Sequence, residues 1–457
     1  MSFLKRDEAK HCVELVTGRS LTGTVELGTT ALQATLFSYD EPFDLPKDEP
    51  VFVRTESGHF VSLHQTIVTG PRQTIATFDP PIVSHSWHVH ADCAVVGHDP
   101  WQTTDLIRNV TFRVTHADPI LCNREVMSRL GKRTAESKDL LELTEGNVTV
   151  RISYGGIYDI DFDSMREYWP GIQLEYAEGV RLDAYMADVY AVIHLLSLVL
   201  WAPLRPSEIS ISRLSRTEQI EALDQNRPFG EHRVEYVWSE PSFEWRNRIR
   251  GPFLSARTSD HIEVLRQCLA TALRRKELWW RANSLMMTCL FLDKEVSANR
   301  LLSACRWFEE IPLARSPPGL PDEAVTAIAV VAANKAGELG FSDIEPRIAG
   351  ALRVLRRETR ADRFARLLGL VGDRYGPMLL GEDAARYLRQ AFVLRGSAAH
   401  GHFASLTDEE FRTLHNAVLA LEALCVLLTA ADLPLDQEAL SQIQSHRSIE
   451  KFHNAFK

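Results

Sequence analysis

The segment Thr407-Asp-Glu-Glu-Phe-Arg-Thr-Leu-His-Asn-Ala-Val-Leu-Ala-Leu-Glu-Ala-Leu-Cys-Val-Leu-Leu428 is the strongest structural signal in this chain of 457 residues. Thr407 is typical of a helix cap, and the acidic residues after it stand in the first turn, where the helix dipole favours negative charge. The largely apolar run from Phe411 to Leu428 then predicts one long helix over residues 407–431.

The same 3.6-residue periodicity continues through the chain beyond Thr258, with few strand signals. The residues after Glu438 are polar and are expected to form a frayed end. Together these signals predict an all-α helical bundle over residues 256–457. Its helices are expected at 259–276, 278–290, 296–310, 322–339, 343–358, 361–371, 382–394 and 407–431.

The front of the chain has a different pattern. Short alternating segments broken by Gly, Pro and Asp run from about Leu21 to Val150, which is typical of a sandwich-like sheet. A strong helix from Leu182 to Trp201 and strands near Ile209 and Val234 follow. We therefore expect an α+β protein with two domains. These are an N-terminal domain over 1–255, β-rich over 1–150 and α/β over 151–255, and a helical domain over 256–457.

Charge is divided unevenly between these parts of a chain whose formal net charge is −10. Residues 1–250 carry 25 Lys and Arg against 36 Asp and Glu, a balance of −11, whereas residues 251–457 carry 26 against 25, a balance of +1. A protein that coats nucleic acid along its whole length is normally basic, because Lys and Arg neutralise phosphates. Any contact with nucleic acid is therefore expected to be local.

Composition and missing motifs indicate the compartment and the cofactor requirement. The seven cysteines are widely spaced and form no C-x-x-C pair, which favours a reducing compartment. No signal peptide is recognisable at the N-terminus, and the apolar run Val189–Ala202 is too short to span a bilayer. Phosphate-binding glycine motifs are also missing. We expect a cytoplasmic protein without membrane contact and without a cofactor.

One short motif stands out in the helical part, Leu394-Arg-Gly-Ser-Ala-Ala-His-Gly401. It places Arg395 and His400 in an R-x4-H arrangement. The bare pattern is weak: it occurs three times, also at Arg54/His59 and Arg227/His232, where 41 Arg and 16 His give roughly 1.4 matches by chance in this chain. Only the Arg395/His400 pair follows a helix in an all-helical region and precedes a long apolar helix.

With this motif in place, the back part resembles an ApeA-type HEPN domain. The resemblance rests on the segments 299–309, 394–401 and 414–424, and the front part is similar to the N-terminal domain paired with HEPN in that family. It implies a metal-independent RNA endonuclease that forms a homodimer through the HEPN domain and acts in antiphage defence by abortive infection. Cellular RNA such as tRNA is the implied substrate, and the N-terminal domain is implied to sense a phage-derived trigger. Gly396 departs from the family pattern, which often has Asn there.

The two residue types suit RNA cleavage by the 2′-OH. A histidine can take or give a proton near neutral pH, and an arginine stays cationic and can hold the charge on phosphorane oxygens. Five residues of unbroken helix turn by about 500°, so Arg395 and His400 would lie roughly 140° apart. Either Gly396-Ser397 breaks or distorts the helix, or two copies of the motif meet across a two-fold interface in a composite site, and both can hold. The alternative is a structural role, in which Arg395 pairs with an acid and His400 caps a helix.

A basic stripe is the candidate RNA-binding surface. At 100° per residue, five arginines fall on one helical face, and a merely solvated face is the alternative. These residues are Arg353, Arg356, Arg357, Arg360 and Arg363.

Two other functions remain open at this stage. The region His85–His98 is dense in histidines, and His88 and His90 on one side of a strand could bind zinc with Cys93 or with a remote carboxylate, although ordinary strand residues have the same pattern. The protein would then be a metal-dependent enzyme. The third hypothesis is a non-catalytic HEPN module for dimerisation and for binding RNA or protein.

Overall fold

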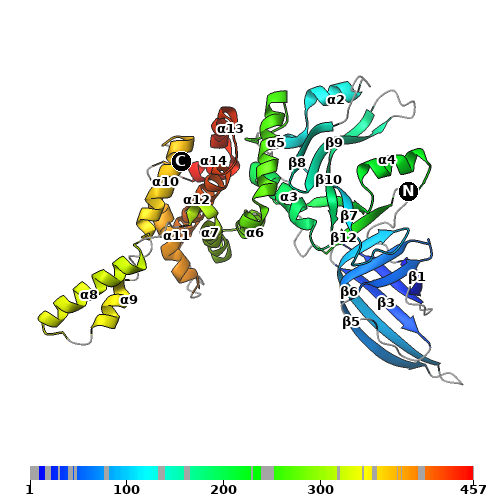
Figure 1. Ribbon diagram of the computed structural model, residues 1–457, viewed down its shortest axis with the longest axis horizontal. Coiled ribbons are helices and arrows are strands. Elements are labelled where there is room, and N and C mark those ends of the chain that lie inside the picture. Colours follow the sequence, from blue (N-terminus) through cyan, green and yellow to red (C-terminus); the bar gives the residue numbers. More distant parts are fainter. Residues whose placement is uncertain are drawn as a thin grey trace. The chain divides into compact units, whose positions relative to one another are not determined.

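The fold is α+β, as predicted from the sequence. In the computed structural model, an antiparallel β region over residues 22–236 precedes an all-helical region over residues 259–454 (Figure 1). The structure describes residues 10–15, 22–28, 31–39, 45, 49–76, 82–131, 139–158, 165–227, 230–237, 252–315, 320–341, 344–352, 358–377, 379–381, 383–399 and 407–455.

Six strands of the N-terminal region close into a ring. Every neighbouring pair is antiparallel, in the order β1-β2-β3-β6-β5-β4 and back to β1. Alternate side chains along these strands are buried together, among them Val25, Val53, Val61 and Trp87, so the ring has its own hydrophobic core. The strands are β1 (Lys10–Leu15), β2 (Thr22–Leu27), β3 (Leu32–Ser38), β4 (Val51–Thr55), β5 (Phe60–Ala76) and β6 (Ile82–Gly97).

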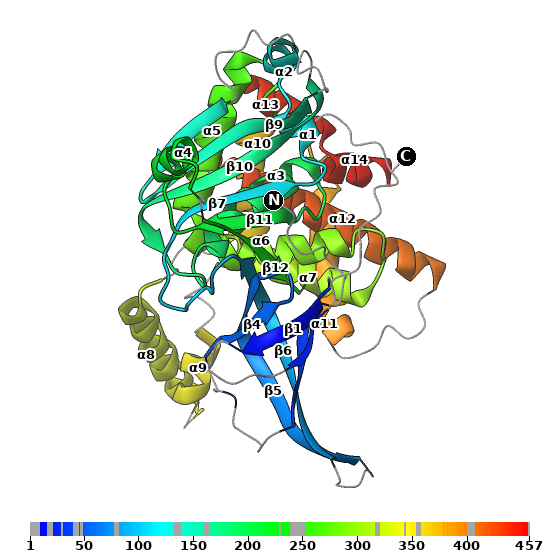
Figure 2. The same ribbon diagram turned by 90° about the vertical axis from the view of Figure 1, so that its right-hand side faces the viewer.

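Strand β6 joins the ring to an open antiparallel sheet. Its first half pairs with β3, whereas the four residues from Cys93 to Val96 pair with β12. From β12 the sheet continues in the order β11-β7-β10-β9-β8. Figure 2 shows the long β5–β6 hairpin extending beyond the other strands of the ring. The strands of the open sheet are β7 (Ile107–Val114), β8 (Asp139–Glu145), β9 (Val148–Tyr158), β10 (Met165–Val180), β11 (Pro206–Ser212) and β12 (Glu231–Tyr236).

Four helices accompany these strands along the chain. The predicted apolar helix is confirmed as α3, whose side chains are buried on nearly every side, as expected of a core helix. A reciprocal capping box between Ser215 and Glu218 begins α4. The helices are α1 (Asp118–Leu121), α2 (Arg124–Gly131), α3 (Met186–Leu200) and α4 (Arg216–Asp224).

The chain divides into two compact units. The β unit takes the described residues up to Ile193, then 204–237 and Ala256–Ile262; the helical unit takes His194–Pro203, 252–255 and the described residues from Glu263 onward. The last turns of α3 therefore belong to the helical unit.

The helices α5 to α12 lie where the periodicity predicts them, most of them within two residues at each end; α10 and α11 end four and five residues later than predicted, and α9 ends at Leu352 rather than at residue 358. The helices that carry the candidate site are α7, α10, α11 and α12. The full set is α5 (Ser259–Arg274), α6 (Lys276–Phe291), α7 (Ala298–Glu310), α8 (Asp322–Glu338), α9 (Glu345–Leu352), α10 (Arg360–Tyr375), α11 (Ala384–Ala399), α12 (Asp408–Ala431), α13 (Gln437–Gln442) and α14 (Arg447–Asn454).

The expected frayed end after Glu438 is wrong. The chain there forms α13 and α14, and α14 buries Ile449 and Phe452 in the helical unit. The segment is short and mostly polar, so its two apolar anchors are easily missed. Tertiary packing of one narrow apolar stripe holds the helix, because a short helix is only marginally stable alone.

The long helix α12 forms the core of the helical unit. Thr407 caps it in a reciprocal box with Glu410, and every residue from Ala417 to Ala430 is buried. By length and composition α12 could cross a membrane, but 83% of its most apolar window is buried inside the protein, as in the core helix of many soluble proteins.

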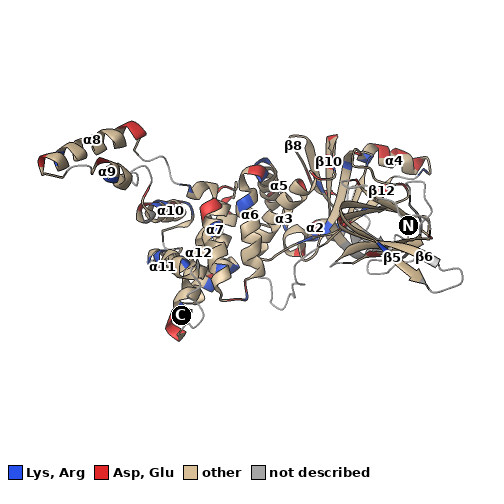
Figure 3. Ribbon diagram, turned by 90° about the horizontal axis from the view of Figure 1, so that it is seen from below, with Lys and Arg blue, Asp and Glu red and all other residues tan. Residues whose placement is uncertain are grey.

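The helices α8 and α9 form a hairpin inserted between α7 and α10. They pack mainly on one another. The middle of α8, from Ala324 to Asn334, carries no charged residue, and Figure 3 shows it between charged ends. Several of its apolar side chains are exposed, including Val331.

Candidate functional site

Arg395 lies near the C-terminal end of α11, and this helix continues without a break through Gly396 and Ser397 to Ala399. A Cβ atom added at Gly396 would meet no atom within 4 Å, so the glycine serves neither a tight packing nor a turn. The expectation that Gly396-Ser397 breaks the helix is therefore wrong over this part of the motif. The other motif residue, His400, lies outside the described residues.

The guanidinium of Arg395 forms an ion pair with the carboxylate of Glu309, which stands near the end of α7. The hydrogen bond from Arg395 to this carboxylate raises the pKa of the arginine above its usual value. The Arg395 side chain also lies over the ring of Phe392, at 5.9 Å from its centroid. It remains about one third exposed, so it can reach solvent and a ligand.

Arg363 approaches the same carboxylate from α10. Its guanidinium lies 4.5 Å from the ring centroid of Phe308, and its Nε is buried with no hydrogen-bond partner. Burial lowers the pKa of Arg363, and the negative charge of Glu309 opposes that change. Glu309 therefore acts on two arginines from two different helices. We call these three residues, Glu309, Arg363 and Arg395, the Arg395 cluster.

Three phenylalanines fix the helices that carry this cluster. The ring centroids of Phe308, Phe364 and Phe392 lie 5.4 to 5.6 Å apart in every pair, and all three side chains are buried. Each ring lies within three residues of one charged member of the cluster. The pairs are Phe308 with Glu309 on α7, Phe364 with Arg363 on α10, and Phe392 with Arg395 on α11. Burial of one such side chain stabilises a fold by about 1.5–3 kcal/mol, so the apolar contact can position the charged groups.

The prediction that five arginines between residues 353 and 363 form one helical face is wrong. α9 ends at Leu352, and Thr359 caps the start of α10 with an extended backbone and an accepted hydrogen bond from the amide of Asp362. The cap satisfies an amide that would otherwise be orphaned, so it favours a new helix here. Arg353, Arg356 and Arg357 lie outside the described residues, and so does the side chain of Arg360. Of the five, only Arg363 is placed, and it lies in the Arg395 cluster.

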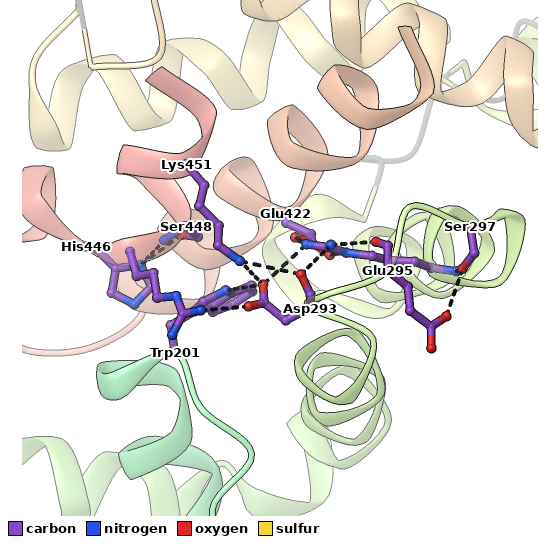
Figure 4. A network of polar contacts seen from close by, with 10 residues as sticks. Trp201, Asp293, Glu295, Ser297, Glu422, His446, Ser448 and Lys451 are labelled. Atoms are coloured by element: carbon purple, nitrogen blue, oxygen red, sulfur yellow. Dashed lines mark hydrogen bonds and ion pairs between the residues drawn. The ribbon is translucent and has the colours of Figure 1, made fainter. Parts of the chain in front are cut away.

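A buried ion network connects α7 to α12 (Figure 4). The guanidinium of Arg300 donates to both carboxylate oxygens of Glu422, at 2.8 and 2.6 Å, and both side chains are almost fully buried. Arg300 also donates to the carbonyls of Asp293 and Glu295, each at 2.8 Å. Such bidentate pairing satisfies the donors of a buried guanidinium. The early helix α7 is thereby bound to the long helix α12.

The same network reaches the C-terminal helix α14 through Asp293. Its carboxylate accepts hydrogen bonds from Lys451 at 2.5 Å, from Arg447 at 3.2 Å and from the indole of Trp201 at 3.2 Å (Figure 4). Burial by itself would raise the pKa of Asp293, but the surrounding cations outweigh it and hold that pKa below its usual value. The network holds α14 in place, which sequence periodicity did not predict.

The histidine-rich strand does not assemble the zinc site considered from the sequence. Along β6, His88 and His90 lie on the less buried side, whereas Cys93 has the opposite parity and is buried. His88 instead contacts the Thr35 hydroxyl, at 3.3 Å. Across the part of the chain that the structure describes, no three His, Cys, Asp or Glu side chains are grouped so as to hold a metal ion. The hypothesis of a metal-dependent enzyme built on His85–His98 has no support from this geometry.

Glu309 was missed as a site residue by the sequence reasoning. It closes the segment 299–309 on which the family resemblance rests, but nothing in its local pattern separates it from Glu310 beside it. The only available signal is indirect. Glu309 follows Phe308 at the end of an amphipathic helix, and its partner is 86 residues away.

Comparison with protein-family models, with curated proteins and with solved structures finds no match to this chain. The HEPN interpretation therefore depends on the motif and its surroundings. The described parts of the three segments behind it, on α7, α11 and α12, are joined by the Glu309–Arg395 and Arg300–Glu422 ion pairs.

Proposed function

We propose that the protein is a metal-independent RNA endonuclease of the HEPN type, with Arg395 and His400 as its catalytic residues. The observation that carries the proposal is the position of Arg395. Arg395 is partly exposed near the end of α11 and lies close to a second arginine, Arg363. The buried phenylalanine cluster packs together the helices that carry both arginines. Two arginines around one acid can accept a phosphate in place of that acid.

The chemistry is transesterification within the RNA. The 2′-oxygen attacks the adjacent phosphorus and the bond from phosphorus to the 5′-oxygen breaks, which leaves a 2′,3′-cyclic phosphate and a free 5′-hydroxyl. His400 takes the proton of the 2′-hydroxyl or returns one to the leaving oxygen. Arg395 holds the negative charge that builds on the phosphorane oxygens.

The proposal takes the composite site as the working form of the enzyme. Because α11 is unbroken from Arg395 to Ala399, a kink at Gly396 does not bring the motif together. A two-fold axis would place two copies of the motif opposite one another, since the same surface of both subunits meets in such an interface. The homodimer is therefore part of the proposal.

The biological role follows from the resemblance to ApeA-like proteins. We propose abortive infection in antiphage defence, with cellular RNA such as tRNA as the target in the cytoplasm and a phage-derived trigger acting on the N-terminal domain. The acidic balance of residues 1–250 is consistent with a domain that keeps RNA at a distance.

The test is RNA cleavage by purified protein in excess EDTA, with sequencing of the RNA ends. Wild-type protein should leave 2′,3′-cyclic phosphate ends, and the Arg395→Ala, His400→Ala double variant should leave none above background. Arg389→Ala is the matched control, because Arg389 is an exposed arginine of α11 whose Nε only donates to the carbonyl of Ala385. Unchanged cutting by the double variant would sink the assignment.

A second candidate is a non-catalytic module that binds RNA or protein. The Glu309–Arg395 ion pair favours it, because an arginine already neutralised by an acid is less available to a phosphate. This alternative predicts that RNA is bound but not cut under any condition. Cleavage that depends on Arg395 would exclude it.

A further inference from the structure

A polar groove lies between α11 and α12, away from the Arg395 cluster. Its volume is about 560 Å³, which is within the range of small-ligand sites. Arg386, Tyr387 and Gln390 line it from α11, and Glu409, Arg412 and Asn416 line it from α12. Nine residues of helix turn by about 900°, so Arg386 and Arg395 point to opposite sides of α11.

Several polar side chains that line the groove have no partner among the described residues. The Oε1 atom of Gln390 is buried and has no hydrogen-bond partner among the described residues. Buried polar atoms in folded proteins are nearly always hydrogen-bonded, so such an atom calls for an explanation. Within the described part of the chain, the side chains of Arg412 and Asn416 also make no hydrogen bond or ion pair. The guanidinium of Arg412 and the amide of Asn416 are accessible to a ligand in the groove, whereas the Gln390 amide would have to turn to present its Oε1 there.

The arginines of the groove are placed to bind an anion. Arg386 donates a hydrogen bond to the Tyr387 hydroxyl at 2.8 Å, and it forms an exposed ion pair with Asp383 at 3.2 Å with which a phosphate would have to compete. Arg412 is exposed on the opposite wall. Glu409 is the single acid among the described lining residues. Two guanidinium groups on facing walls match the oxygens of a phosphate group.

The side-chain amides of Gln390 and Asn416 suit the base of a nucleotide rather than its phosphate. Side-chain amides of Gln and Asn offer a donor and an acceptor side by side, which match the edge of a nucleobase. Tyr387 is buried and is therefore part of the wall rather than a platform for stacking. Recognition in this groove would thus use the base edge, as is common for unpaired RNA bases.

We propose that the α11–α12 groove binds one nucleotide of single-stranded RNA, with its base edge at Gln390 and Asn416 and its phosphate at Arg386 and Arg412. The inference rests on the proposed function, because RNA is the substrate there. It adds a subsite that selects the base at one position, on the far side of the helix that carries Arg395. Arg395 and Gln390 would then lie on one helix, α11, with Asn416 facing Gln390 across the groove from α12.

The experiment measures binding of labelled rA8, rC8, rG8 and rU8 to the full-length Arg395→Ala protein. On this background, Gln390→Ala with Asn416→Ala should weaken binding of the preferred oligomer about tenfold and reduce the difference between the four, since a base contact is worth about 1–3 kcal/mol. Arg412→Ala should weaken all four alike and lower the slope of log affinity against log salt by about one.

The controls remove side chains of the same types from outside the groove. Arg389→Ala removes an exposed cation of α11 that does not line the groove, and Gln437→Ala removes an amide from α13. Neither should change base preference. Because Arg412 is exposed, Arg412→Glu remains informative if the double amide variant does not fold, and it should reduce binding of every oligomer more than Arg412→Ala does.

The possible results distinguish a failure of the groove proposal from a failure of the nuclease proposal. If wild-type protein cuts RNA but the groove variants bind all four oligomers unchanged, the groove proposal is wrong and the nuclease stands. If the groove variants lose binding and preference while the wild-type protein never cuts, the groove stands and the nuclease fails. Absence of RNA binding by the Arg395→Ala background overturns the groove proposal. The groove proposal is also overturned if the groove variants change the sedimentation coefficient of the protein but leave RNA binding unchanged, because the groove would then be a subunit interface.

Discussion

Glu309 on α7 and Arg395 on α11 form an ion pair across 86 residues of sequence. Both side chains are partly exposed, so the pair contributes little to stability, about 0–1 kcal/mol. Its importance for the proposed enzyme is that a phosphate and the Glu309 carboxylate compete for the same guanidinium.

Replacement of Glu309 by Gln should therefore tighten RNA binding several-fold. The change removes the negative charge that faces both Arg363 and Arg395 while keeping a hydrogen-bond acceptor. Binding of a labelled oligoribonucleotide at low salt is the measurement. Glu310→Gln is the matched control, because it makes the same change in net charge one residue away. An equal effect of both variants would show that net charge alone is responsible.

Replacement of Gly396 by Ala should raise the free energy of unfolding by about 0.5–1 kcal/mol, because glycine inside a helix costs that amount relative to alanine. The site is exposed, with no atom within 4 Å of an added Cβ. Denaturant unfolding measures the change. Gly376→Ala should instead destabilise the protein, since Gly376 ends α10 with a φ of 104°, where alanine is strained. A loss of stability in Gly396→Ala would contradict the helical conformation at this position.

Removal of the Glu422 carboxylate should destabilise the helical unit by about 3–5 kcal/mol, because Arg300 would remain buried without its counter-ion. The variants are Glu422→Gln alone and Glu422→Leu together with Arg300→Met, and urea unfolding is the measurement. The double variant should recover most of the loss, since it leaves no unpaired charge. The exposed pair Arg266–Glu263 provides the control, and Glu263→Gln should leave the midpoint of urea unfolding nearly unchanged, because solvent screens an exposed pair.

Stability should fall as the pH drops from about 6.5 towards 4. His446 is buried, and burial lowers its pKa to about 4. Its Nε2 donates to the carbonyl of Leu198 at 2.8 Å, and its Nδ1 accepts from the amide of Ser448 at 3.4 Å, so the neutral ring is the one that fits. Between these pH values the unfolded chain binds a proton that the folded chain does not, at a cost on the order of 3 kcal/mol.

The midpoint of urea unfolding at pH 7.5 and pH 5 tests this dependence. In His446→Gln the difference between the two midpoints should shrink, although part of it should remain because burial also lowers the pKa of His194 to about 4. His90→Gln, at an exposed site of β6, should keep the full difference. An undiminished pH dependence in His446→Gln would contradict the role assigned to His446.

Local pattern was enough to predict most of the secondary structure. The apolar periodicity and the Thr407 cap predicted α12, and the same reasoning predicted the other helices from α5 to α11 within a few residues. These signals are local, because a helix satisfies its hydrogen bonds within a few residues of sequence. α14 escaped this reasoning because its stability depends on burial of Ile449 and Phe452 by distant elements.

The candidate site was predictable only in part. Sequence alone selected Arg395 from its motif, and it placed Arg363 on a helical stripe that the Thr359 cap does not allow. It could not pair Arg395 with Glu309, close the strand ring by joining β3 to β6, or place Gln390 in a groove with Asn416. All of these relationships join residues far apart in the chain. The sequence by itself therefore determined the helices and the motif, whereas the partners of each charged residue were decided by tertiary packing, because burial and ion pairing depend on which distant side chains come within a few ångströms.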